Sequence, residues 1–174
     1  MDAIELLTLL EIGETSRVQF KDKMPHGDSI AQEIVAMSNS AGGIILFGIE
    51  DVTGTVNGLS PEEIELYDRQ ISQVADNIKP PVYVTTEVVN TGKIGETRNV
   101  LAVHVQDGIN KPYKTSKGEI FVKQGANKRQ LVDNGEIMRL FQRSGNLLAD
   151  EMEVYDTSIE YLKPRYLSPS LPSA

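Results

Sequence analysis

The chain has 174 residues, of which 40% are apolar and 24% charged, with a formal net charge of −8 at pH 7. This composition is typical of one globular domain and excludes a fibrous repeat or a chain that is disordered throughout. The absence of cysteine excludes disulfides and every site built on thiolates. No apolar run approaches the roughly 18 residues of a membrane span, and Asp2 and Glu5 argue against a signal peptide, so we expect a cytoplasmic protein without a membrane partner.

The first third of the sequence alternates helical and extended patterns. Residues 4–10 predict a short helix, and residues 17–21 alternate polar and apolar side chains as a half-buried strand does. A helix is expected over 29–39, and the continuous apolar run of residues 44–49 then predicts a strand buried on both faces. Residues 51–58, which contain Gly54 and Gly58, are expected to form a turn or a short hairpin.

The rest of the chain begins with a strong helix start and continues with extended segments. Ser60 and Pro61 have the residue types of a helix cap and first position, and the helix they open is predicted to end near residue 78. Residues 82–90 and 99–105 predict a hairpin, and residues 113–124 predict a second one that turns at Lys117-Gly118. Residues 133–143 fit an amphipathic helix.

These elements predict an α/β (α+β) domain in which a mixed β-sheet is flanked by helices. The expected strands lie near Val18, Ile45, Val84, Val103 and Phe121, and the helices over 29–39 and 61–78 are expected to cover the sheet. The domain is predicted to span residues 1–145. Residues 146–174, with three prolines, are expected to be a linker or tail toward a further C-terminal region.

A basic segment stands out against the acidic average. Residues 110–130 have a net charge of +5, which leaves −13 for the remainder of the chain. Because charges more than ~8–10 Å apart are mostly screened, such a segment can bind phosphate on an acidic protein. The predicted phosphate contacts are Lys111, Lys114, Lys123, Lys128 and Arg129. Tyr113 and Phe121 are expected to add stacking surface for bases; the alternative is an ordinary solvated hairpin.

Acidic residues at the ends of the predicted elements are the second feature. Glu14, Glu50 and Asp51 could converge on a divalent cation, which prefers several oxygen ligands. The alternative is that they are solvated acids in turns. No phosphate-binding Gly-Lys-Ser/Thr pattern and no Gly-x-Gly-x-x-Gly pattern is present.

Taken together, the segments resemble the Schlafen AlbA-type DNA-binding domain family over about residues 5–141. The resemblance is carried by Gly-Glu-x4-Gln-Phe-Lys (13–21), Met-Ser-Asn-Ser-Ala-Gly-Gly (37–43), Ile-Leu-Phe-Gly-Ile-Glu-Asp (45–51), Lys-Pro-Tyr (111–113) and Ile-Phe-Val-Lys-Gln-Gly-Ala-Asn-Lys-Arg (120–129). In bacteria the family occurs mainly as the N-terminal domain of predicted transcriptional regulators. The resemblance therefore implies a domain that binds nucleic acid, in the first place DNA, and has further C-terminal domains; it leaves a homodimer open.

The same resemblance raises a second function, because some animal Schlafen proteins are metal-dependent endoribonucleases that use three acids. By position these acids fall on Glu14, Gln19 and Asp51, and residue 19 is commonly Glu in the family. With Gln19 the metal candidates are Glu14 and Asp51 alone, so binding of Mg²⁺ or Mn²⁺ is expected to be weak. We expect little or no nuclease activity, and an increase in metal affinity on Gln19→Glu. A protein-interaction module that uses the acidic surface is the third alternative.

Overall fold

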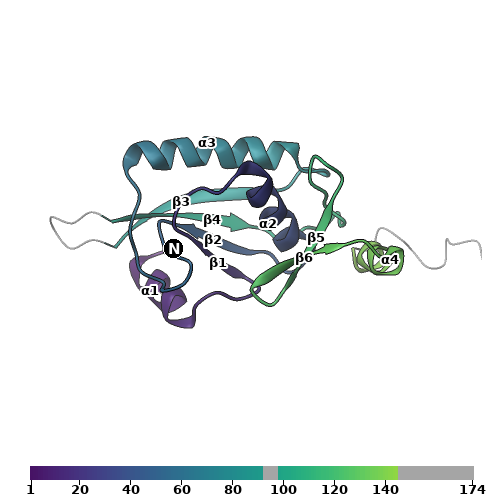
Figure 1. Ribbon diagram of the computed structural model, residues 1–174, viewed down its shortest axis with the longest axis horizontal. Coiled ribbons are helices and arrows are strands. Elements are labelled where there is room, and N and C mark those ends of the chain that lie inside the picture. The colour runs from purple at the N-terminus through teal and green to yellow at the C-terminus, as the bar shows by residue number, and fades with distance from the viewer. Residues whose placement is uncertain (92–97, 145–174) are drawn as a thin grey trace, which may run out of the picture.

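Helices and strands alternate through the first half of the computed structural model, which describes residues 1–91 and 98–144 (Figure 1). The helices are α1 (Ala3–Ile12), α2 (Gly27–Asn39), α3 (Pro61–Asn77) and α4 (Asn134–Arg143). The strands are β1 (Val18–Lys21), β2 (Gly43–Phe47), β3 (Val84–Asn90), β4 (Asn99–Val105), β5 (Ile120–Gln124) and β6 (Asn127–Leu131). The expected tail, residues 146–174, lies outside the described residues.

The predicted helices are confirmed, and side-chain caps explain where they begin. At the start of α3, the Ser60 hydroxyl accepts from the Glu63 amide at 3.2 Å, and the Glu63 carboxylate accepts from the Ser60 amide at 2.9 Å. Asp133 caps α4 by accepting from the Glu136 amide at 2.9 Å. None of the helices in the described ranges has the length and apolar character needed to cross a bilayer.

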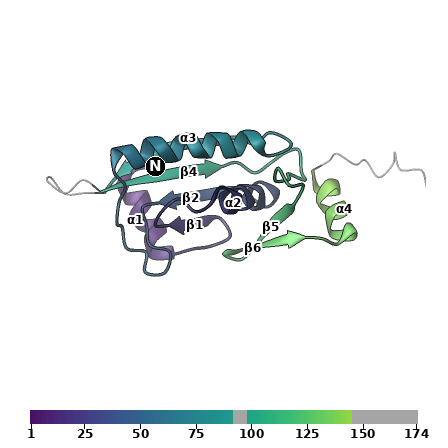
Figure 2. The same cartoon turned by 45° about the horizontal axis from the view of Figure 1, so that its top comes forward.

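A mixed sheet of four strands forms the centre of the fold, in the order β1-β2-β4-β3. The pair β1/β2 is parallel, and the pairs β2/β4 and β4/β3 are antiparallel. Leu101 and Val103 of β4 pack toward α2 and α3, whereas Val100 and Ala102 pack with α1 on the opposite face. Helices therefore cover both faces (Figures 1 and 2), which explains the continuous apolar run of β2.

The segment around Phe121 departs from the prediction. It does not join the main sheet but forms a separate sheet of two strands, β5 and β6. The predicted turn at Lys117-Gly118 is present, yet it is not the turn of the hairpin, which lies between Gln124 and Asn127. Gly125 has a φ of +60° there, a conformation that favours glycine. The β5–β6 hairpin packs beside α2 at one end of the main sheet, and α4 follows it (Figure 2).

Gly42 and Gly43 bring the backbones of this end of the sheet close together. A Cβ atom at Gly43 would lie 2.5 Å from the carbonyl oxygen of Arg17, and one at Gly42 would lie 2.7 Å from the amide nitrogen of Asp107. The glycine pair therefore serves close packing of backbone on backbone.

Candidate nucleic-acid interface and the neighbouring acidic site

The last residue of α2 and the residue after it attach the β5–β6 hairpin to the body of the domain. The buried Asn39 side chain donates to the carbonyl oxygens of Tyr113 and Phe121, both at 2.9 Å, and accepts from the Tyr113 amide at 2.7 Å. The Ser40 hydroxyl accepts from the Lys123 amide at 2.8 Å. These contacts fix the backbone on both sides of the Lys117-Gly118 turn.

Tyr113 and Phe121 do not form the base-stacking surface that the sequence suggested. Their exposed fractions are 4% and 7%, and both belong to the hydrophobic core beneath α2 and α3. In this fold they contribute packing, so the hairpin offers bases neither of these two aromatic faces.

A basic cleft lies where the hairpin, the end of α2 and α4 meet. Its volume is about 390 Å³, and it is lined by five Lys or Arg residues and one acidic residue. The lining residues are Asn39, Ser40, Lys111, Val122, Lys123, Arg129, Leu131, Glu136, Arg139, Leu140 and Arg143. Converging cations in a concave surface are the arrangement that binds phosphate groups.

Arg139 and Arg143 were absent from the sequence-based set of phosphate contacts. Both are exposed on α4 and are four residues apart, so they lie on the same side of the helix. The signal was available, because residues 133–143 were predicted to be helical. The two arginines lie beyond the basic segment of residues 110–130, so the local excess of charge does not include them.

Two of the predicted phosphate contacts, Lys111 and Arg129, line the cleft, and each forms an ion pair with a carboxylate. The Lys111 ammonium is 2.6 Å from the Asp107 carboxylate and donates to the Ser40 carbonyl at 2.8 Å. Arg129 donates two hydrogen bonds to Glu136, at 2.8 and 2.9 Å. This forked pair lowers the pKa of Glu136 and raises the pKa of Arg129.

The other three predicted contacts lie elsewhere or point inward. Lys114 is exposed in the loop before β5 and does not line the cleft. Lys128 donates to the backbone and hydroxyl of Ser29 at 3.1 and 3.2 Å, and burial lowers its pKa against the opposing effect of Glu33. The Lys123 side chain has no exposed surface, so in this conformation its ammonium cannot touch a phosphate outside.

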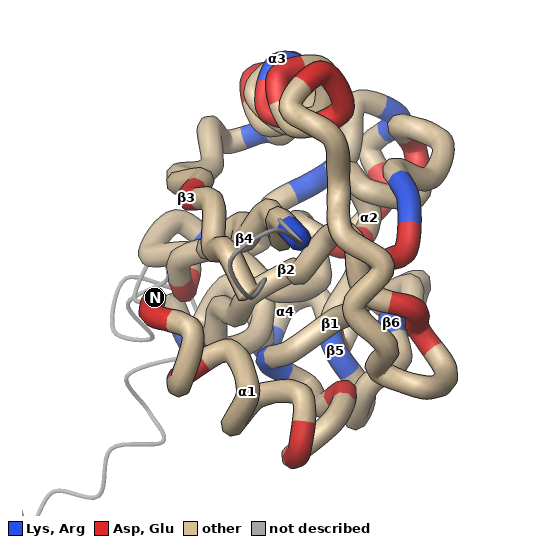
Figure 3. Tube along the Cα trace, turned by 90° about the vertical axis from the view of Figure 1, so that its left-hand side faces the viewer, with Lys and Arg blue, Asp and Glu red and all other residues tan. Residues whose placement is uncertain are grey.

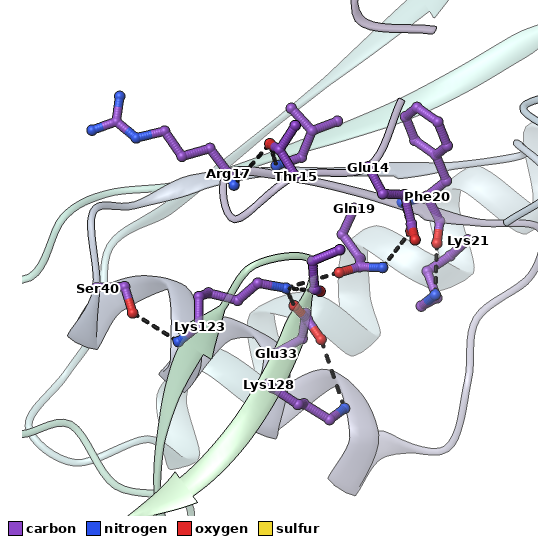
Figure 4. Close-up of polar contacts among 12 residues, drawn as sticks. Glu14, Thr15, Arg17, Gln19, Phe20, Lys21, Glu33, Ser40, Lys123 and Lys128 are labelled. Carbon is purple, nitrogen blue, oxygen red and sulfur yellow. Dashed lines mark hydrogen bonds and ion pairs between the residues drawn. The ribbon is translucent and has the colours of Figure 1, made fainter. Parts of the chain in front are cut away.

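The structure brings together only part of the predicted acidic site (Figure 4). One Glu14 carboxylate oxygen accepts from the Gln19 side-chain amide, and also from the Phe20 backbone amide at 2.8 Å. Asp51 instead pairs with the Lys21 ammonium and accepts from the Asp22 amide at 3.1 Å. Glu14 and Gln19 are therefore partners, whereas Asp51 is bound to the residues that follow Phe20.

These residues do not fit a resident Mg²⁺ or Mn²⁺ ion. Within residues 1–91 and 98–144, no three His, Cys, Asp or Glu side chains are grouped so that they could hold a metal. Lys21 neutralises Asp51, and the ammonium of Lys123 donates to Gln19 at 2.9 Å. A divalent cation would replace hydrogen-bond donors with its own charge beside an ammonium, which repels it.

Comparison with known proteins gives a family and a fold. Residues 14–132 match the model of the family described as Schlafen, AlbA_2, a range that leaves out α1 and α4. The crystal structure of the DIP2311 protein from Corynebacterium diphtheriae is similar to 82% of this chain, with 22% identity and a TM-score of 0.53. The similar region covers 32% of that protein, so this chain spans about a third of its length. A search of curated proteins finds no match.

Proposed function

Because this chain belongs to the Schlafen AlbA_2 family, we propose that it is a DNA-binding domain that holds the phosphates of double-stranded DNA in the basic cleft. Membership of the family supports a nucleic-acid-related role. The observation that supports the cleft as the interface is its charge: besides the enclosed Lys123, four cationic residues line it (Lys111, Arg129, Arg139 and Arg143), against one acidic residue. That carboxylate, Glu136, is already paired with Arg129.

Two further observations concern how DNA would bind: one favours contacts to the DNA backbone over contacts to unstacked bases, and the other indicates the side from which DNA approaches. Tyr113 and Phe121 are buried, so the hairpin lacks the aromatic platform that single-strand binding uses. Acidic residues of α3 and α1, coloured red along the trace in Figure 3, lie on elements other than the hairpin and α4, and their charge repels a polyanion. DNA would therefore approach the end of the molecule formed by the hairpin and α4. Phosphate contacts of this kind fix position without selecting a sequence.

The wider role is part of the same proposal. We place the domain over residues 1–145 of a cytoplasmic transcriptional regulator, with residues 146–174 leading to a further C-terminal region. The similarity of this chain to about a third of a longer protein is consistent with that arrangement.

Titration of labelled duplex DNA, single-stranded DNA and structured RNA by fluorescence anisotropy at two salt concentrations tests the proposal. The double variant Arg139→Glu/Arg143→Glu should lose at least about tenfold in affinity for the duplex, and its salt dependence should be shallower by about 1.8, since each phosphate contact contributes ~0.9. The control Arg17→Glu/Arg69→Glu makes the same charge change at two exposed arginines outside the cleft.

Equal losses in the two double variants would show that net charge alone, and not the cleft, determines binding. Tighter binding of RNA than of the duplex would replace DNA as the ligand. Sedimentation of the same samples tells whether one copy or a homodimer occupies the duplex.

A further inference from the structure

The ammonium of Lys123 is enclosed among acceptors contributed by distant parts of the chain. It donates to the Glu33 carboxylate at 2.6 Å, to the Gln19 side-chain oxygen at 2.9 Å and to the Ala126 carbonyl at 2.6 Å (Figure 4). These three acceptors use all three hydrogens of the ammonium. The side chain of Lys123 has no exposed surface and that of Glu33 is 7% exposed, so the pair is shielded from water.

Gln19 has the chemistry that this position requires. Its amide donates to the carboxylate of Glu14 on one side and accepts from the ammonium of Lys123 on the other. Glutamate at position 19 would accept from Lys123 equally well but would have no hydrogen to give to Glu14. The neutral amide and the buried lysine are therefore a matched pair.

A second ammonium group already lies beside this site. The other oxygen of the Glu33 carboxylate is 3.7 Å from the Lys128 ammonium. The backbone of Lys123 is itself fixed, because its amide donates to the Ser40 hydroxyl at 2.8 Å. To admit a metal ion, the domain would have to expel a buried ammonium and move β5 away from α2.

We propose that Lys123 is a built-in cation that takes the place of a divalent metal ion beside Gln19 and Glu33, with Glu14 joined to the site through Gln19, so that this site binds no Mg²⁺ or Mn²⁺. The inference does not rest on nucleic-acid binding, since it concerns the interior of the domain. It changes the earlier expectation for Gln19→Glu: a carboxylate at position 19 beside Lys123 gains an ion pair, and the single substitution creates little affinity for metal.

The test measures Mn²⁺ binding by the loss of the electron paramagnetic resonance signal of the free ion. The wild-type protein should leave the signal unchanged at millimolar Mn²⁺. Gln19→Glu/Lys123→Met should bind Mn²⁺ at least about tenfold more tightly than the wild type, and Mn²⁺ should raise its melting temperature. The matched control Gln19→Glu/Lys128→Met also removes one neighbouring ammonium but keeps Lys123, and it should gain little.

Tight Mn²⁺ binding by the wild-type protein that is lost in Glu14→Gln would overturn the proposal. So would a folded Gln19→Glu/Lys123→Met protein that binds no better than its control. If that variant does not fold, nuclear magnetic resonance of the wild type decides. The side-chain signals of Lys123 and Gln19 should be the same with millimolar Mg²⁺ as with a chelator, and a shift of both on adding Mg²⁺ contradicts the built-in cation.

Discussion

Asn39 shows how much a single amide at the end of a helix can hold in place. It lies at the C-terminus of α2, is 3% exposed and satisfies three backbone groups of the segment that leads into and through β5. Among the hydrogen bonds of residues 1–91 and 98–144, no other side chain donates to the backbone of both Tyr113 and Phe121. Its role is to position the hairpin, and with it one wall of the basic cleft.

Replacement of Asn39 by alanine should lower the free energy of unfolding by about 3 kcal/mol. Three buried backbone groups would lose their hydrogen-bond partner, and each buried polar group without a partner costs ~1–3 kcal/mol. Urea denaturation followed by circular dichroism measures the change. Asn77→Ala makes the same substitution at an exposed residue whose side chain donates only to the Gln73 carbonyl, and it should change stability by at most about 0.5 kcal/mol. Similar values for the two variants would contradict the anchoring role of Asn39.

For single residues, the sequence predicts the type and charge of a side chain but not its distant partner. The neutrality of Gln19 was visible, and with it the loss of one negative charge from the acidic site. The partner of Gln19 was not visible, because Lys123 lies 104 residues later and a buried ion pair leaves no periodic pattern. For the same reason Lys123 was assigned to phosphate binding, although Glu33 holds it inside.

Among the elements, the hairpin and α4 are joined by the forked pair of Arg129 and Glu136. The pair connects two walls of the cleft across solvent-accessible surface, with side chains 44% and 34% exposed. It also occupies the donors of Arg129 that a phosphate would use. The carboxylate of Glu136 therefore competes with a polyanion for the same guanidinium.

Glu136→Gln should increase the affinity for duplex DNA several-fold and make the salt dependence steeper by about 0.9, as expected for one additional phosphate contact. The anisotropy titration described above measures both quantities. Glu65→Gln removes one carboxylate of a looser exposed pair, with Arg69 at 3.6 Å on α3, and should have little effect. An equal gain in the two variants would mean that only the net charge of the protein had changed.

The elements themselves were predictable where local chemistry specifies them. The Ser60 cap and the alternation of β1 were sufficient, because caps and amphipathic patterns depend on neighbouring residues. The second hairpin was misplaced because the segment has two glycine turns, at Gly118 and Gly125, both with positive φ. Glycine marks a turn but does not specify which flanking segments pair.

For the whole molecule, the distribution of charge couples stability to pH. Within residues 1–91 and 98–144, hydrogen bonds and ion pairs lower the pKa values of five carboxyl groups below their ordinary values of 3.8 for Asp and 4.5 for Glu. The groups are Asp28, Glu62, Glu63, Glu87 and Glu136. Each contributes stability that is complete above the ordinary pKa and is lost as the pH falls through the lowered value.

The melting temperature should therefore be nearly constant from about pH 6 to 8 and decrease below about pH 4.5. This decrease should occur although the isoelectric point is about 4.8, where repulsion from the net negative charge disappears. Circular dichroism melts at constant ionic strength measure the profile. A melting temperature that rises steadily from pH 6 to pH 4 would show that relief of net repulsion outweighs the paired carboxylates.

The fold class was predictable at this scale, but the order of the strands was not. Helices on both faces and a mixed sheet follow from the sequence of elements and from the apolar run in β2. The position of β4 between β2 and β3 depends on pairing between strands that are distant in the chain, and no local pattern records it. The position of the hairpin on α2 depends in the same way on packing between distant segments.

The buried pair of Glu33 and Lys123 also has a consequence for the order in which the chain is made. The two residues are 90 positions apart, so a ribosome delivers the main sheet, its covering helices and the carboxylate before it delivers the ammonium. Until the hairpin emerges, Glu33 lacks the ammonium that accompanies it in the folded domain, and burial of the carboxylate without that partner would be costly. The interior of this domain can therefore be completed only from its C-terminal third, and a chain that ended before residue 123 would lack the charge that its own interior requires.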